Sequence, residues 1–126
     1  MGVIGAAHGR DLLTASIDAG TMYLALYATD PTKDDSGNEA VGGVYARKII
    51  SMGTPAEVAL KQVISNDAAV DFGEQTTVLG IITHWAIHGH LSNSDLRWFG
   101  SFDQAKEIYN GDSLEIDIGE IDCILS

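Results

Sequence analysis

Apolar residues alternate along the stretch from Met22 to Pro31 (MYLALYATDP) so that both faces of an extended strand carry aromatic or aliphatic side chains. This pattern is typical of a strand packed on both sides. Asp30-Pro31 should end the strand, because proline cannot donate a ladder hydrogen bond. A second long strand is predicted from Gly80 to Gly89 (GIITHWAIHG), with Ile81, Thr83, Trp85 and Ile87 on one face and Trp85 in the core.

Shorter segments of the same kind predict the remaining strands. The polar segment Pro31–Gly43 reads as a loop that leads from the first strand into its hairpin partner, Val44–Met52. The other predicted strands are Lys61–Ser65, Ala68–Phe72, Leu96–Phe102, Ala105–Tyr109, Ser113–Ile118 and Ile121–Leu125. Tight turns at Asn66-Asp67 and Asn110-Gly111-Asp112 should join neighbouring strands. Short strands at this spacing predict an all-β fold, an antiparallel, jelly-roll-like β-sandwich.

A short helix is predicted near the N-terminus, over Ala7–Asp18. Leu12, Leu13 and Ile17 form its apolar stripe, and Gly20 is placed to end it. The stripe has two possible partners: the end of this chain's own sandwich, which the helix would cover as a lid, or a neighbouring subunit, against which it would pack as an arm.

Thr54-Pro55-Ala56-Glu57 matches a helix capping box, which predicts either one helical turn through Leu60 or a long turn. In the C-terminal half, Leu114, Ile116 and Ile118 should form the buried face of a strand, since acidic residues alternate with them. With 126 residues the chain is expected to fold as one domain, 1–126, with residues 1–20 as an N-terminal arm and helix.

The charge balance narrows the class of partner. The chain has 7 basic and 18 acidic residues, a net charge of −11. Such acidity disfavours nucleic acid and anionic membranes and suits docking on a basic protein. No apolar run approaches the length of a membrane span. Cys123 is the single cysteine, so no intrachain disulfide can form, and its apolar surroundings predict a buried thiol.

No group of residues predicts catalysis or a cofactor. His84, His88 and His90 suggest zinc, but residues four apart on a strand lie about 13 Å apart, too far for one ion. The acidic loop from Asp30 to Glu39 suggests calcium, but its spacing is not that of an EF-hand. Nucleophile elbows, P-loops and dinucleotide fingerprints are absent. We therefore expect a protein that is not an enzyme and binds no cofactor or metal.

Arg47 stands among apolar neighbours in the second predicted strand. One interpretation is structural: its stem packs on the sheet while the guanidinium pairs with a carboxylate or caps loop carbonyls. The other is functional, as an anchor for a ligand or a second subunit. The structural interpretation is favoured, because an arginine buried without a partner is rare.

In this order, the elements resemble a family of small bacteriophage structural proteins, often labelled tail-fibre or decoration proteins. The resemblance covers about the whole chain, and its motifs mark turns and core. It rests on Tyr23–Pro31, on GGVYAR at Gly42–Arg47, on Ile64-Ser65-Asn66 through Val70 and Phe72, on GIITHWAI at Gly80–Ile87, and on Gly111–Gly119 with Ile121 and Leu125. The sequence departs from the family's pattern at His88-Gly89-His90 and in its acid-rich ending.

The resemblance implies an oligomeric structural protein of the virion, assembled in the bacterial host cytoplasm. We expect a capsid decoration (cement) protein, bound as a homotrimer to the major capsid protein on the outer shell. A tail, tail-fibre or adaptor component is the first alternative. A lectin-like carbohydrate- or calcium-binding module using Trp98, Tyr109 and the acidic loop is the second. The residues predicted to make contacts are Leu12, Leu13, Ile17, Arg47, His88 and His90.

Overall fold

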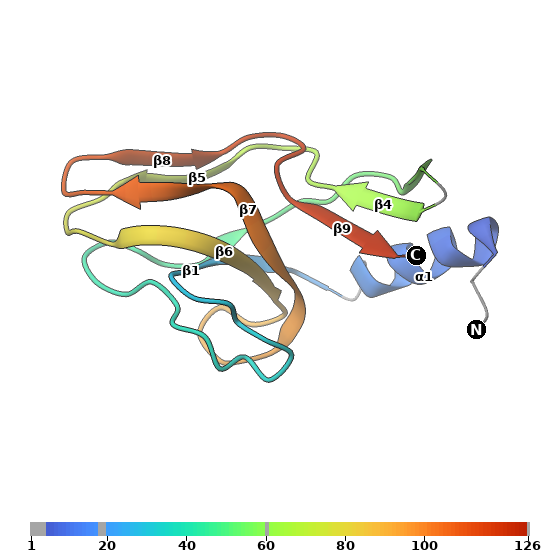
Figure 1. The fold of residues 1–126 in the computed structure, drawn as a ribbon, viewed down its shortest axis with the longest axis horizontal. Coiled ribbons are helices and arrows are strands. Elements are labelled where there is room, and N and C mark those ends of the chain that lie inside the picture. Colours follow the sequence, from blue (N-terminus) through green and yellow to red (C-terminus); the bar gives the residue numbers. More distant parts are fainter. Residues whose placement is uncertain (1–4, 18–19, 60, 126) are drawn as a thin grey trace.

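The computed structural model describes residues 5–17, 20–59 and 61–125 of the chain. Within these ranges a single helix, α1 (Ala6–Ile17), precedes nine strands (Figure 1). The strands are β1 (Tyr23–Tyr27), β2 (Lys48–Ile49), β3 (Ala56–Val58), β4 (Lys61–Ser65), β5 (Val70–Glu74), β6 (Gly80–His88), β7 (Leu96–Ile108), β8 (Ser113–Ile116) and β9 (Asp122–Leu125).

The strands form two layers. One layer is a four-stranded antiparallel sheet in the order β2-β1-β6-β7. The other combines a three-stranded sheet, β3-β4-β9, with the pair β5-β8. Because β4 leads into β5 and β8 leads into β9, this second layer is one bent ribbon that spans the long axis of the molecule (Figure 1). The predicted antiparallel all-β sandwich with a short N-terminal helix is confirmed.

The main core lies between these layers. Both layers and the helix contribute to it, with Leu13, Met22, Leu24, Leu26, Ile64, Val70, Phe72, Ile82, Trp85, Ile87, Leu114, Ile116, Ile121 and Cys123 among its buried residues. On the opposite face of β1, Ala25 and Tyr27 pack with Ala86 in a second cluster. The prediction that this strand is buried on both faces is confirmed.

The alternation predicted for β6 is interrupted. Its register with β7 shifts between Ile82 and His84, and such a bulge moves the following residues to the other face. As a result Ile82 is fully buried with Trp85, while Ile81 is 52% exposed. Ile118, which was predicted to be buried, is also exposed. β8 ends at Ile116, and the chain turns at Asp117–Glu120.

Four predicted elements differ from the structure because strand pairing overrides local signals. Residues 54–59 form neither a helical turn nor a long turn, since Ala56–Val58 pairs with β4 as β3. Leu60, the predicted end of this turn, lies outside the described residues. The strand predicted over Val44–Met52 shrinks to Lys48–Ile49, because Gly42 and Gly43 adopt left-handed conformations and a turn forms between Gly42 and Tyr45. The two strands predicted over residues 96–109 are one bent strand, β7.

The predicted turns at Asn66-Asp67 and Asn110–Asp112 exist but do not make hairpins. They join strands of different sheets: β4 to β5, and β7 to β8. At the first of these corners the buried Asn66 side chain donates to the carbonyls of Ala68 and Asp117 and accepts from the amide of Ile121. One amide side chain therefore holds both strands of the ribbon where they bend.

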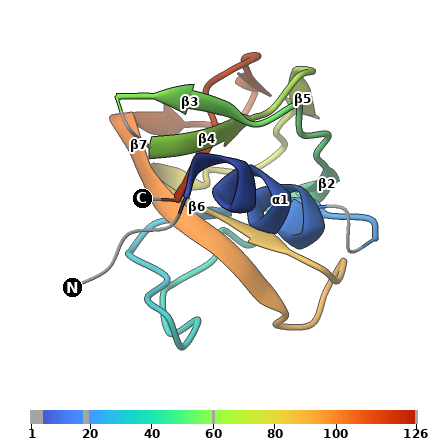
Figure 2. The same cartoon turned by 90° about the vertical axis from the view of Figure 1, so that its right-hand side faces the viewer.

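Helix α1 lies against β4 (Figure 2). It packs there through Leu13, which is 1% exposed, whereas Leu12 is 45% exposed. The predicted lid on this chain's own sandwich is therefore present. Residues 1–4 and 18–19 of the predicted arm, and the side chain of Ile17, lie outside the described residues. Among the residues that the structure describes, no helix has the length and apolar character needed to cross a bilayer.

Replacing Asn66 by alanine should destabilise the fold by about 2–3 kcal/mol, because it leaves buried backbone groups of the corner without partners. Urea unfolding monitored by tryptophan fluorescence measures the effect. Asn110→Ala, in an exposed turn, is the matched control and should change the free energy of unfolding by less than about 0.5 kcal/mol. Equal losses in the two variants would contradict the role given to Asn66.

Candidate functional site: locked loops and a groove between sheet edges

Arg47 joins two loops that are far apart in the sequence. Its Nε and Nη2 donate to the two carboxylate oxygens of Glu39, at 3.0 and 2.7 Å. Its Nη1 donates to the carbonyls of His90 and Asn93, at 2.9 and 2.8 Å. A planar guanidinium suits this fork, because it offers donors on two sides at once. Arg47 thereby fastens the loop of residues 28–47 to the loop of residues 89–95.

A second set of contacts links the same loops through β1. The Tyr27 hydroxyl donates to Asp35 at 2.5 Å and lies 2.9 Å from Nε2 of His88. The other oxygen of Asp35 accepts from the hydroxyl of Ser94. We call Tyr27, Asp35, Glu39, Arg47 and His88 the polar network. The loops that it joins lie together on the lower side of the molecule in Figures 1 and 2.

The hydrogen bonds of His88 assign its tautomer. Its Nδ1 accepts from the amide of Asp95 at 3.1 Å, so the ring proton sits on Nε2 and is donated to Tyr27. The side chain is completely buried. Burial, reinforced by the positive charge of Arg47, lowers the pKa of His88 and keeps the ring neutral.

Asp35 is held in its charged form, whereas His88 is held in its neutral form. Burial opposes its ionisation, but hydrogen bonds from Ser94 and Tyr27 outweigh burial and lower the pKa of Asp35. On Tyr27, burial and the neighbouring carboxylate of Asp35 raise the pKa, so its hydroxyl keeps the proton that it donates. The network is therefore a fixed chain of donors and acceptors rather than a set of reactive groups.

The predicted contact residues separate into two groups. Leu13, Arg47 and His88 are buried, and their contacts are made within this chain. The structural interpretation of Arg47, which pairs with a carboxylate and caps loop carbonyls, is confirmed. Direct contact of these three residues with a partner stays a prediction. Leu12 and His90 are exposed. For these two, contact with a partner stays a prediction.

Three of the four carboxylates of the acidic loop, those of Asp30, Asp35 and Glu39, make hydrogen bonds within the protein. Asp30 accepts from the amide of Thr32, while Asp35 and Glu39 belong to the polar network. His90 accepts two amides of its own turn. Over the described ranges, no three His, Cys, Asp or Glu side chains are placed to hold a metal ion.

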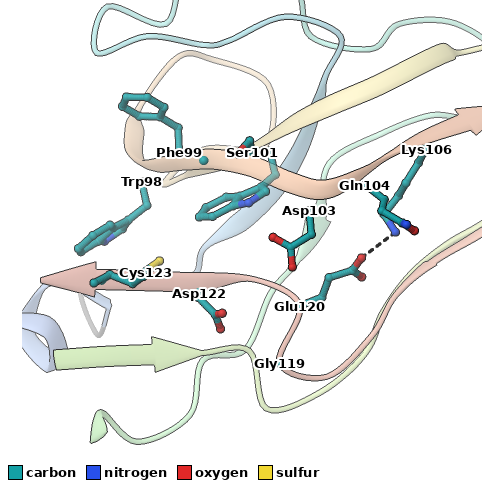
Figure 3. Close-up of a pocket in the computed structure, with 13 residues that line it drawn as sticks. Trp98, Phe99, Ser101, Asp103, Gln104, Lys106, Gly119, Glu120, Asp122 and Cys123 are labelled. Carbon is teal, nitrogen blue, oxygen red and sulfur yellow. Dashed lines mark ion pairs between the residues drawn. The ribbon is translucent and has the colours of Figure 1, made fainter. Parts of the chain in front are cut away.

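A groove of about 750 Å³ lies between β7 and β9 (Figure 3). Trp98, Phe99 and Asp103 line it from β7, and Asp122 and Ile124 line it from β9. Lys106 and Glu120 form an ion pair at 2.7 Å that joins the two sides at one end. The groove is thus apolar near Trp98 and acidic along its length.

Two other polar features bear on the groove's chemistry. Cys123 lies at its base, and burial raises the pKa of its thiol to about 12, so a nucleophilic thiolate is disfavoured. Tyr109, which the lectin-like alternative places beside Trp98, is not among the residues that line the groove. Its hydroxyl donates to Glu107.

Sequence reasoning missed the groove and the partners within the network. It marked Arg47, His88 and the acidic loop separately, but a charge pattern does not say which of several carboxylates meets an arginine. The excess of acid in the loop opposite a lone buried arginine was the available signal for Glu39. For the groove no local signal exists, because it is formed by two strands that belong to different sheets.

Arg47→Lys should destabilise the protein by about 2–4 kcal/mol, because one ammonium cannot serve both carboxylate oxygens and two carbonyls in a buried site. The matched control is Arg97→Lys, which alters the more exposed ion pair with Asp95 and should cost less than about 1 kcal/mol. Urea unfolding of both variants decides the matter. Similar losses would mean that the Arg47 fork contributes no more than a surface pair.

Stability should fall between pH 7 and pH 5 because of His88. An unfolded histidine binds a proton below about pH 6.5, whereas folded His88 resists protonation to lower pH. The unfolded state thus binds more protons in this window, and the free energy of unfolding rises with pH.

The test compares wild type with His88→Gln in urea at several pH values between 5 and 8. The wild type should lose more stability toward pH 5 than His88→Gln does. Parallel curves for the two proteins would show that His88 is not held neutral.

Comparison with known families completes this description. The model of a family described as Podophage GP4 fiber I protein gp80 matches residues 12–123. No curated protein matches the chain significantly. The match includes the locked loops and most of the groove, and it bears out the resemblance to phage structural proteins. The chain belongs to the podophage GP4 fiber I protein gp80 family and is a structural protein of the phage virion.

Proposed function

We propose that this chain is a non-enzymatic component of a podophage tail fibre. The observation that carries the proposal is the family match, which runs from α1 into β9 and names a fibre protein. The structure is compatible with this role. Its buried polar groups hold loops in place, and a rigid body with fixed loops suits a component that transmits contacts in a particle.

Capsid decoration is the second candidate, and a different observation favours it. The described residues form a compact sandwich without a shaft, and the chain carries a net charge of −11. Such a module suits many copies bound to basic patches of a major capsid protein. Decoration thus rests on shape and charge, whereas the fibre role rests on the family.

Both roles require protein partners, either tail proteins or the major capsid protein, and we propose self-association as a homotrimer. Exposed apolar side chains on adjoining loops support self-association. Val41 is 82% exposed, and Val44 and Val78 are more than half exposed. Gly43, between the first two, approaches Thr76 and Thr77 of the other loop. Exposed apolar side chains that adjoin in this way suit a contact with another protein surface.

Copy number and position in the virion separate the two roles. We expect quantitative mass spectrometry of purified particles to find few copies, and a reconstruction to place them at the tail as trimers. Copies in proportion to the coat protein, distributed over the shell, would contradict the fibre role and establish decoration. Capsids separated from tails provide the control, since a fibre component should remain with the tail fraction.

A further inference from the structure

The groove between β7 and β9 reaches into the sandwich as far as Trp85. This residue belongs to β6, the neighbour of β7 in the sheet, and it lines the groove although it is only 4% exposed. Its partner on β7 is Gly100, which also lines the groove. A Cβ at Gly100 would lie 2.8 Å from Cζ2 of the Trp85 ring and 3.3 Å from Nε1, so the missing side chain leaves room for the indole. The edge of this indole forms the floor of the groove.

The indole nitrogen of Trp85 has no hydrogen-bond partner among the described residues, although buried polar groups are nearly always paired. Two buried side-chain atoms of the described chain, Oε1 of Gln62 and Oε1 of Gln75, lack a partner and are also sealed from solvent. Nε1 of Trp85 is not in this sealed class, so solvent reaches it from the groove. A donor that is almost covered and opens on the floor of a groove suits a ligand that places an acceptor there.

An irregular segment of β7 brings polar side chains to one wall of the groove. The register of β7 with β6 shifts after Ser101, so residues 102–105 stand opposite Thr83 alone. A bulge of this kind re-aims side chains, and here Asp103 and Gln104 line the groove. Figure 3 shows both side chains directed toward the opposite wall. Neither side chain bonds to another described residue, so both are available to a ligand.

These three groups together require a ligand that both donates and accepts hydrogen bonds. The Nε1–H of Trp85 needs an acceptor, the carboxylate of Asp103 needs a donor, and the amide of Gln104 takes either. A hydroxyl group supplies one donor and two acceptor sites. A ring that carries several hydroxyls can therefore satisfy all three groups at once.

The charges of the groove favour a neutral ligand. Asp103, Glu120 and Asp122 line it, and Lys106, the one cation among the described residues that line it, pairs with Glu120 at 2.7 Å. An anionic ligand would be repelled by the carboxylates. An ammonium ligand offers donors but no acceptor, so it would leave the Nε1–H of Trp85 unpaired.

We propose that the groove is a binding site for a neutral saccharide, with a hexopyranose ring as the bound unit. Trp85 donates to one hydroxyl, Asp103 and Gln104 bind others, and the half-exposed side chain of Ile124 contacts the C–H groups of the ring. The groove volume of about 750 Å³ is that of a small-ligand site, about 300–1,000 Å³.

This site goes beyond the fibre and decoration roles and depends on neither, since it belongs to the isolated chain. It also differs from the lectin-like module that the sequence suggests, because it uses neither Tyr109 nor the acidic loop. Failure of the saccharide test therefore leaves the copy-number experiment unaffected.

The indole N–H signals in nuclear magnetic resonance spectra report binding at the site directly. The chain has two tryptophans, so the full-length ¹⁵N-labelled protein gives two indole signals, and a Trp98→Phe sample assigns them. The probes are the methyl glycosides of glucose, galactose, mannose and N-acetylglucosamine, each raised to tens of millimolar. At least one should move the Trp85 indole proton downfield in a saturable manner, because its N–H forms a hydrogen bond on binding.

Two ligands serve as controls. Sorbitol carries the same hydroxyl groups on an open chain, and the methyl glycoside of N-acetylneuraminic acid carries a carboxylate on its ring. Neither should move the Trp85 signal in a saturable manner, because the first lacks the rigid ring and the second is repelled by the carboxylates.

A variant of the protein tests the polar wall. Asp103→Asn is an exposed change of nearly equal shape, which replaces a charged acceptor by a neutral one and should weaken binding about fivefold. Glu115→Gln is the matched control, because Glu115 is exposed on β8 and does not line the groove. It should bind the glycoside as the wild type does.

Three results would overturn the proposal. The first is the absence of a saturable shift of the Trp85 signal with every one of the four glycosides. The second is binding that Asp103→Asn leaves unchanged, which would place the sugar elsewhere on the molecule. The third is a Trp85 shift caused by a neutral peptide of alternating serine and glycine but by none of the glycosides, which would make the groove a peptide site.

Discussion

The burial of β1 on both faces is the constraint on which the rest of the molecule depends. One face, with Leu24 and Leu26, closes the core between the two layers. The other face, with Ala25 and Tyr27, must also be covered, although no second sheet lies on it among the described strands. The loops of residues 28–47 and 89–95 cover it instead, and loops bring polar backbone into a buried place.

The polar network follows from that requirement. The carbonyls of His90 and Asn93 accept from the buried guanidinium of Arg47, and Glu39 balances its charge. Tyr27 and His88 are neighbours on the covered face, and they satisfy each other and the second loop. The loops therefore belong to the folded body. The open features of the molecule lie elsewhere, at the exposed valines and at the groove between β7 and β9.

Sequence reasoning predicted the features set by periodicity. The two-sided strand, the long strand with Trp85, the helix with buried Leu13 and the sandwich all follow from apolar spacing. It failed where a partner far along the chain decides the outcome. Ala56–Val58 is a strand because β4 lies beside it, and Asn110–Asp112 is a corner because β8 pairs with β5 rather than β7.

The same limit applies to the candidate surfaces. Arg47 and His88 were recognisable as unusual, and the structural interpretation of Arg47 was the better one. Their partners, Glu39 and Tyr27, emerge only when the loops meet. The groove depends on a bulged strand, β7, and a bent ribbon that brings β9 opposite to it, so no window of sequence contains it.

Native-state hydrogen exchange of two amides tests most directly whether these loops belong to the core. The amide of Ala40 donates to Leu26, and that of Asp95 donates to His88. If the loops are locked to the doubly buried strand, both amides should exchange only with the free energy of global unfolding. Exchange through local opening, several kcal/mol below global unfolding, would contradict the account by showing that the loops move independently of the sandwich.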